Sequence, residues 1–160
     1  MTSTAAPNAS PADSTANSTD SADSADRTTT SRALLAGLTA TVAALIGNTV
    51  VAQIALAAGA SEDFTPLTLG AYGFLTVVGV IAGLVGWLVV RRTTNAAATL
   101  RWLVPTVLVL SFVPDILVGF SDRAGVSWGA VLALMAMHVV LTVTAVATFS
   151  RLLPVTRAHG

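Results

Sequence analysis

Two ionisable side chains lie inside apolar stretches of this 160-residue chain, and they are the first residues to consider for chemistry. Asp115 follows Pro114 near the end of one stretch, and His138 lies in the middle of another. Ionisable residues inside a membrane are energetically costly, usually face a bundle interior or a cavity, and are functional candidates by default. A carboxylate and an imidazole could bind a small ligand or relay protons, because imidazole titrates near neutral pH.

Three uncharged polar residues, Asn48, Gln53 and Ser111, join them as candidates for a ligand or proton-relay site. Ser111 shares a helix face with Asp115, four residues further on. With a rise of about 1.5 Å per residue, Gln53 and Asp115 lie roughly 9 Å and 8 Å below the outer ends of their helices. Asn48 and His138 both lie roughly 16 Å deep, near the middle of the hydrocarbon core.

Two hypotheses follow from this placement. The first is a polar track that enters from the outer face at Gln53 and Asp115 and continues to Asn48 and His138. The second is a set of interhelical hydrogen bonds that only holds the bundle together. We favour the second for Asn48 and Gln53, and both stay open for Asp115 and His138.

The sequence predicts neither a catalytic site nor a metal site. Ser111, Asp115 and His138 have the residue types of a hydrolytic triad, but no motif places them. Thiolate and Schiff-base chemistry are excluded because the chain has no cysteine and no lysine. One intramembrane histidine and one carboxylate are too few ligands for a closed zinc site. We therefore expect a protein that is not an enzyme and binds no cofactor.

The apolar stretches around these residues are long enough to cross a membrane, which takes about 20 residues of helix. Of the whole chain, 54% is hydrophobic and 10% is charged. We expect an all-α fold, an integral membrane four-helix transmembrane bundle, with spans at about 33–59, 69–90, 102–120 and 127–149. Two prolines interrupt the third span, and a break at Pro114 would leave Asp115 capping a short outer segment.

The N-terminal residues 1–31 contain no aromatic and no branched aliphatic residue. Such a segment cannot bury enough apolar surface to offset the entropy of ordering, so a disordered N-terminal tail is expected. It lacks the apolar stretch and cleavage site of a signal peptide and is expected to persist. The transmembrane domain is then 32–154, and residues 155–160 form a second short tail.

Arginines set the expected orientation of the bundle. Seven of the eight basic residues fall on one side of the four spans, and only Arg123 falls on the other. Because cytoplasmic loops are enriched in positive charge, both termini are expected in the cytoplasm. Aromatic residues near the ends of the spans agree with these boundaries; they are Tyr72, Trp87, Trp102 and Trp128.

Small residues predict where the helices touch, because helices in lipid pack closely at such positions. One stripe repeats every four residues and consists of Ala36, Ala40, Ala44 and Asn48. The second stripe is a Gly-x-x-x-Gly pattern with a further glycine, made of Gly79, Gly83 and Gly86. We expect contacts within the chain, rather than a homodimer, at both stripes.

Three short runs resemble an uncharacterised family of small four-helix membrane proteins from actinobacteria, domain of unknown function 6069. The runs are 33–37 (ALLAG), 111–115 (SFVPD) and 137–140 (MHVV), and the resemblance covers about 32–154. It implies a four-span bundle in a bacterial inner membrane, and it brings no known activity.

The expected function is that of a non-enzymatic scaffold or accessory subunit in the lipid bilayer, in contact with another membrane protein or a second copy. The alternative is a small transporter, or a ligand-binding or proton-relay bundle that uses the polar track. A nucleic-acid partner is not expected, because the formal net charge is zero.

Overall fold

The structure, a computed structural model, describes residues 11–155. Its elements are α1 (Pro11–Ala57), the short 3-10 helix η1 (Thr65–Leu67), α2 (Leu69–Val90), α3 (Ala96–Gly119) and α4 (Trp128–Leu152). No strand occurs within the described range. The all-α fold predicted from the sequence is therefore confirmed.

Four helical segments are long and apolar enough to cross a membrane, as judged by length and composition. They are Arg27–Ala57, Leu69–Val90, Ala96–Gly119 and Trp128–Leu152. The third segment starts at Ala96, ahead of the predicted position 102, because three alanines with high helix propensity begin it. It is also continuous through Pro105 and Pro114, so a break at Pro114 is not found.

The N-terminal helix begins at Pro11, well before the predicted start of the first span at residue 33. Proline is well suited to the first turn of a helix, and no proline or glycine follows until Gly37. Residues 1–10 and 156–160 lie outside the described range, and the tail predicted for 1–31 stays a prediction. The chain divides into two units, residues 1–32 and residues 33–160.

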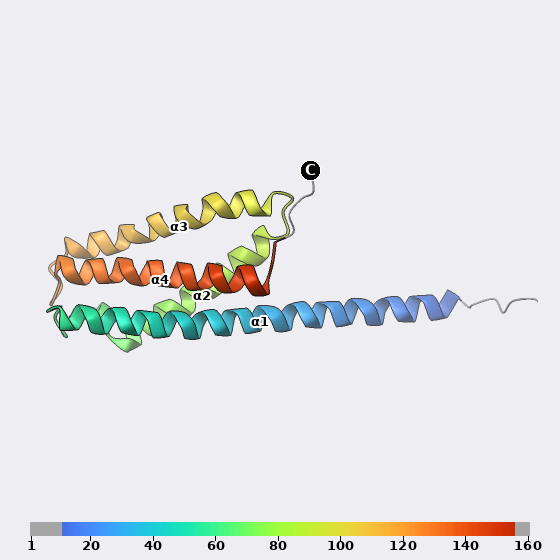
Figure 1. Ribbon diagram of the computed structural model, residues 1–160, viewed down its shortest axis with the longest axis horizontal. Helices are drawn as coiled ribbons and strands as arrows, with labels where there is room; N and C mark the ends of the chain where they lie inside the picture. The colour runs from blue at the N-terminus through green and yellow to red at the C-terminus, as the bar shows by residue number, and fades with distance from the viewer. Residues whose placement is uncertain (1–10, 156–160) are drawn as a thin grey trace, which may run out of the picture. The chain divides into compact units, whose positions relative to one another are not determined.

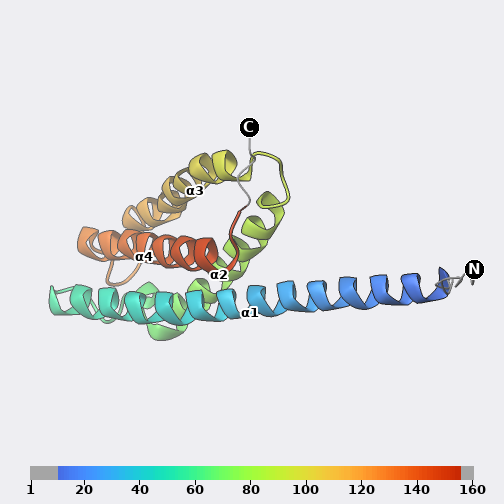
Figure 2. The same ribbon diagram turned by 45° about the vertical axis from the view of Figure 1, so that its right-hand side comes forward.

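Within the second unit the helices run alternately up and down. In both views α4 lies between α3 and residues 33–57 of α1, while α2 crosses behind α4 (Figures 1 and 2). The central position of α4 explains why its apolar residues pack against all the other helices. It also places His138, halfway along α4, where side chains of several helices can reach it.

The predicted alanine stripe of α1 is buried. Ala36, Ala40 and Ala44 are fully buried, and Asn48 and Ala52 continue the same face. A Cβ added at Gly47 would lie 2.5 Å from Cγ1 of Val140, so the α1 and α4 backbones approach closely there.

The glycines of α2 contact α4 at one end of their stripe only. A Cβ at Gly79 would lie 2.7 Å from Leu141, and one at Gly83 would lie 3.7 Å from Phe149. A Cβ at Gly86 would meet no atom within 4 Å. Gly79 therefore marks the close α2–α4 contact, whereas Gly86 does not take part in it.

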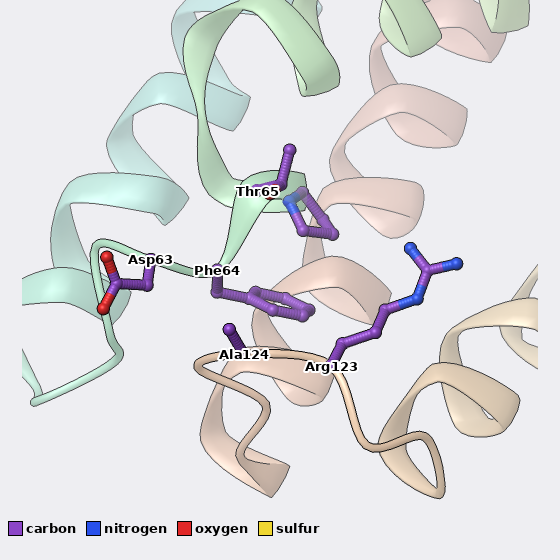
Figure 3. A pocket seen from close by; sticks show the side chains of 6 residues that line it. Asp63, Phe64, Thr65, Arg123 and Ala124 are labelled. Atoms are coloured by element: carbon purple, nitrogen blue, oxygen red, sulfur yellow. The ribbon is translucent and has the colours of Figure 1, made fainter.

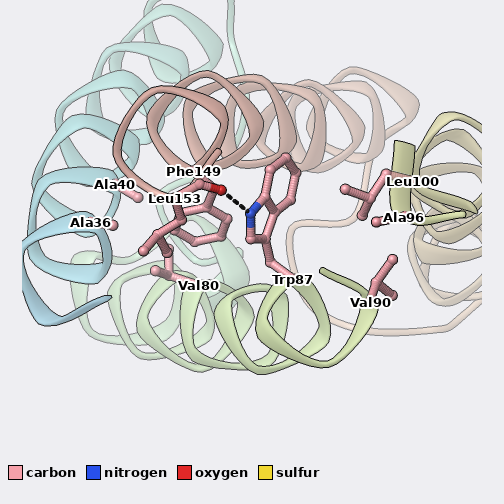
Figure 4. Packing of buried hydrophobic residues seen from close by; sticks show 9 residues of the cluster. All are labelled: Ala36, Ala40, Val80, Trp87, Val90, Ala96, Leu100, Phe149 and Leu153. Atoms are coloured by element: carbon pink, nitrogen blue, oxygen red, sulfur yellow. Dashed lines mark hydrogen bonds between the residues drawn. The ribbon is translucent and has the colours of Figure 1, made fainter. Parts of the chain in front are cut away.

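One end of the bundle is closed by Trp87, which is buried in a cluster of apolar side chains from α1, α2, α3 and α4 (Figure 4). Its ring lies against Phe149, with ring centroids 5.8 Å apart, and its Nε1–H donates to the carbonyl oxygen of Leu153 at 2.9 Å. Tyr72 is buried as well, and its hydroxyl lies 3.0 Å from that of Thr49. The rings of Trp87 and Tyr72 therefore both face the bundle interior.

Of the four aromatic residues predicted to mark span ends, Trp102 and Trp128 are exposed. A belt at the membrane surface, as predicted from the sequence, therefore fits these two and not Tyr72 or Trp87. The sequence marks proximity to a span end, but it does not show which side of the helix an aromatic ring occupies.

At the opposite end, the loop after α1 and the loop after α3 pack against each other. Gly125 has a φ of 73°, and a Cβ there would lie 2.8 Å from the backbone nitrogen of Phe64 and 3.0 Å from Ser61. Glycine is the residue that fits, because it tolerates positive φ and leaves room for the neighbouring backbone. Phe64 is buried beneath this contact.

Candidate functional site

Asp115 of α3 and His138 of α4 meet inside the bundle. The Nδ1 atom of His138 lies 2.9 Å from Oδ2 of Asp115 and 3.1 Å from the carbonyl oxygen of Leu134. Both distances are within hydrogen-bond range, and the tautomer and protonation state of the ring decide which oxygen the Nδ1–H serves. Oδ2 of Asp115 is buried against the ring, and the two side chains form an ion pair when the ring is protonated.

The two side chains meet because α3 and α4 are antiparallel. Counted along their helices, Asp115 is shallow and His138 is deep, so the sequence assigned them to different layers. A helical side chain leans toward the N-terminus of its own helix. In antiparallel neighbours this moves Asp115 inward and His138 outward, which closes most of the difference in depth.

Asn48 of α1 is the third polar residue of the site. It is 3% exposed, and its Nδ2 donates to the hydroxyl oxygen of Thr76 in α2 at 2.8 Å. Its Oδ1 accepts no hydrogen bond. Among the described side chains, this oxygen is a buried atom with neither a hydrogen-bond donor nor an ion-pair partner, whereas Oδ2 of Asp115 has the His138 ring beside it.

Asn48, Asp115 and His138 all line one cavity of about 380 Å³, which we name the polar pocket. Every helix of the second unit contributes to it. The residues that line it are Asn48, Pro66, Tyr72, Leu75, Thr76, Pro114, Asp115, Val118, Arg123, Leu134, Met137, His138 and Leu141. The pocket therefore has mostly apolar walls, a few converging polar groups and one arginine, as is typical of small-molecule sites.

Comparison with known proteins identifies the family. Residues 28–154 match the family of unknown function DUF6069. The chain belongs to this family. No curated protein and no solved structure matches the chain. Asn48, Asp115 and His138 all lie within the DUF6069 domain, as do the other residues of the polar pocket.

Two candidates from the sequence lie outside the polar pocket of this DUF6069 domain. Gln53 is exposed, because it follows the buried Ala52 and is rotated about 100° away from the face that α1 turns to its neighbours. The hydroxyl of Ser111 donates to the carbonyl oxygen of Leu108 at 2.7 Å, one turn back in α3. Of the four residues of the predicted polar track, Asn48, Asp115 and His138 line the polar pocket, and Gln53 does not.

Thr76 and Arg123 are pocket residues that reasoning from the sequence missed. A threonine in the middle of the uncharged α2 is a weak signal of a polar contact, and its bond to Asn48 is found only once the helices are paired. Arg123 was noted in the sequence only for its charge, and in the structure it lies beside the loop after α1.

A second hollow of about 270 Å³ lies between this loop and the loop after α3, lined in part by Asp63, Phe64, Thr65 and Arg123 (Figure 3). The Arg123 side chain extends away from the Asp63 carboxylate, toward α3 (Figure 3). Arg123 lines both hollows and therefore stands at the loop end of the polar pocket. Nowhere in the described range do three His, Cys, Asp or Glu side chains come together to hold a metal ion.

Proposed function

We propose that this DUF6069 protein is a non-enzymatic, multi-pass membrane protein that binds a small ligand in the polar pocket. The observation that carries the proposal is one cavity lined by Asn48, Asp115 and His138, in which Asn48 also has a buried oxygen, Oδ1, without a hydrogen-bond partner. A buried acceptor without a donor costs about 1–3 kcal/mol. Native proteins retain few such atoms, and each needs a reason.

Binding supplies that reason, because Asn48, Asp115 and His138 offer a ligand in the cavity polar groups from three helices. A scaffold or accessory subunit, the first expectation from the sequence, needs only helices that pack. Leucine at position 48 or 115 would pack the same helices without the cost of burying a polar group. The scaffold role therefore leaves the composition of the polar pocket unexplained.

The proposal includes a location in the inner (plasma) membrane with both termini in the cytoplasm. The four apolar helices supply the spans. Arginines flank the α2–α3 loop and follow α4, whereas Arg123 alone lies at the other end. This is the distribution that the preference for positive charge on the cytoplasmic side produces.

A ligand screen tests the binding function. The purified protein in lipid nanodiscs is heated with a library of small molecules, and compounds that raise the unfolding temperature are kept. A ligand at 100 times its dissociation constant stabilises the folded state by about 2.7 kcal/mol. We expect hits that stabilise the wild type and have no effect on Asp115→Asn.

The matched control is Asp122→Asn, which makes the same change at an exposed aspartate outside the polar pocket. It should respond to every hit as the wild type does. Hits that stabilise Asp115→Asn as strongly as the wild type would show that the pocket is not the binding site, and the scaffold role would then stand.

Proton relay is the second candidate, favoured by the 2.9 Å contact between the Asp115 carboxylate and the His138 ring. Acid and base groups within hydrogen-bond distance can pass a proton between them. Proteoliposomes that contain the wild type should then show proton flux that both Asp115→Asn and His138→Gln abolish. Equal flux in all three proteins would remove this candidate.

A further inference from the structure

We propose that the ligand of the polar pocket is a lipophilic amine, with its ammonium group at Asp115 and its apolar body between α2 and α3. This inference rests on the binding function proposed above, and it names the class of ligand and the path by which it arrives.

The polar end of the ligand follows from the acceptor groups of the pocket. Asn48 and Asp115 both line it and carry carbonyl and carboxylate oxygens, so the groups that fit them are hydrogen-bond donors. Asp115 is 6% exposed, and the His138 ring at 2.9 Å compensates its charge only when the ring is protonated. A carboxylate can accept more than one hydrogen bond, so a second donor can bind it beside the ring. An ammonium group provides the charge and several N–H donors together.

The apolar end follows from the walls of the pocket. Leu75, Val118, Leu134, Met137 and Leu141 surround the polar groups. These side chains offer no hydrogen bonds to a hydrophilic ligand, whereas they gain from burying an alkyl or aryl body. Methionine adapts to irregular shapes, which suits a wall that holds a flexible chain.

The pocket is open sideways, between α2 and α3. Leu75 is 61% exposed although it lines the cavity, and Pro114 is exposed on the facing helix. Both lie within candidate spans, roughly 9 Å and 8 Å from the outer helix ends. The His138 side chain is 35% exposed, so the opening reaches the ring. A ligand dissolved in the membrane therefore has direct access at the depth of the hydrocarbon core.

Arg123 distinguishes this ligand from a small inorganic cation. It stands at the loop end of the pocket, where a hydrated cation would have to pass, and like charges repel. The lateral opening between α2 and α3 avoids the guanidinium group. A cation that is itself lipophilic can therefore reach Asp115, and a hydrated metal ion is disfavoured.

Three octyl compounds test the assignment by titration calorimetry against the wild type in nanodiscs, with empty nanodiscs subtracted. They are octylamine, octanol and octyltrimethylammonium. We expect octylamine to bind at least about tenfold more tightly than octanol, because its hydrogen bond to a carboxylate is charge-assisted. Octyltrimethylammonium should bind more weakly than octylamine, since it carries the charge without N–H donors.

Two substitutions with matched controls locate the site and the path. Asp115→Asn should lose at least about tenfold in octylamine affinity and keep its octanol affinity, whereas the exposed Asp122→Asn changes neither. Leu75→Trp should slow octylamine association by filling the opening. Val78→Trp, on the exposed side of the same helix and outside the pocket, should leave the rate unchanged.

Octylamine binding that is no tighter than octanol binding, or that survives Asp115→Asn, would overturn the amine assignment. If the amine assignment fails in this way but Asp115→Asn abolishes octanol binding, the polar pocket is still a ligand site. Only the chemical class assigned to the ligand is then wrong. If none of the three compounds binds, the amine assignment is overturned, and the ligand screen decides the proposed function. An unchanged association rate in Leu75→Trp would overturn the lateral path.

Discussion

The structural role and the ligand-binding role of Asn48 predict different effects of its replacement on stability. Its Nδ2 bonds to Thr76 and stabilises the contact between α1 and α2, whereas its Oδ1 is buried without a partner. If Asn48 only holds helices together, as expected from the sequence, its replacement should weaken the fold. If it serves a ligand, the fold should tolerate an apolar residue there.

We expect Asn48→Leu, made together with Thr76→Val, to leave the free energy of unfolding unchanged from the wild type or to raise it by up to about 2 kcal/mol, because the unpartnered Oδ1 disappears together with both partners of the bond. Thr49→Val is the control, since it breaks the Thr49–Tyr72 contact without removing any unpartnered atom and should cost about 0.5–1.5 kcal/mol. Unfolding in SDS titrations measures both. A clear loss of stability when Asn48→Leu and Thr76→Val are combined would favour the purely structural interpretation.

Trp87 makes a separate prediction at the residue scale. Trp87→Phe keeps the ring contact with Phe149 and removes the donor to the Leu153 carbonyl, so the buried carbonyl loses its partner. We expect a loss of about 1–3 kcal/mol in the free energy of unfolding. Trp102→Phe, at an exposed position, should change it by less than about 0.5 kcal/mol. Similar losses in the two variants would contradict the interior role of Trp87.

Residue type alone was enough to select Asp115 and His138, because charge inside a span is rare. It was not enough to group the candidates correctly. Depth along a helix can be counted from the sequence, and this count put Gln53 beside Asp115. Rotation about the helix axis depends on which face each neighbour covers, and one step of about 100° sends Gln53 outward. Thr76 was missed for the same reason.

At the scale of elements, the loops show most clearly what pattern reasoning leaves out. The spans follow from runs of apolar residues, and the end of α2 at Val90 and its start at Leu69 were predicted correctly. The contact between the loop after α1 and the loop after α3 joins residues more than 60 positions apart, such as Ser61 and Gly125. No local sequence pattern predicts this contact between the two loops.

Three glycine substitutions test this loop contact. Gly125→Ala should cost more than about 1–3 kcal/mol, because it combines a positive φ with a clash against the Phe64 backbone. Gly59→Ala has a φ of 97° and no neighbour within 4 Å, so it should show the backbone strain alone. Gly70→Ala lies in α2 in open space and should be neutral or stabilising. Thermal unfolding should rank the three variants in this order; equal losses at Gly125 and Gly59 would argue against the loop contact.

At the scale of the whole molecule, four spans and their order could be predicted because membrane insertion depends on length and apolar composition. The packing of the bundle could be predicted only in part. The alanine stripe of α1 is buried, yet Gly86 of α2 contacts nothing, because a small residue permits close packing and does not require it. The central place of α4, which brings His138 to Asp115, has no signature in the sequence.

The proposed orientation is tested with two reporters, one active only in the periplasm and one only in the cytoplasm, fused in turn after Thr94, Asp122 and Gly160. Cytoplasmic activity is expected after Thr94 and Gly160, and periplasmic activity after Asp122, since seven of eight arginines would then face the cytoplasm. A periplasmic signal after Thr94 or Gly160 would contradict both the orientation and the even number of spans.

The central claim is that Asn48, Asp115 and His138 serve one binding site. A double-mutant cycle tests it most directly, using the tightest compound from the ligand screen and its dissociation constants for the wild type, Asn48→Leu, Asp115→Asn and the double variant. Each single variant should fold and bind about tenfold or more weakly, and the double variant should lose less than the sum because both groups hold the same molecule. Wild-type affinity in either single variant would contradict the claim.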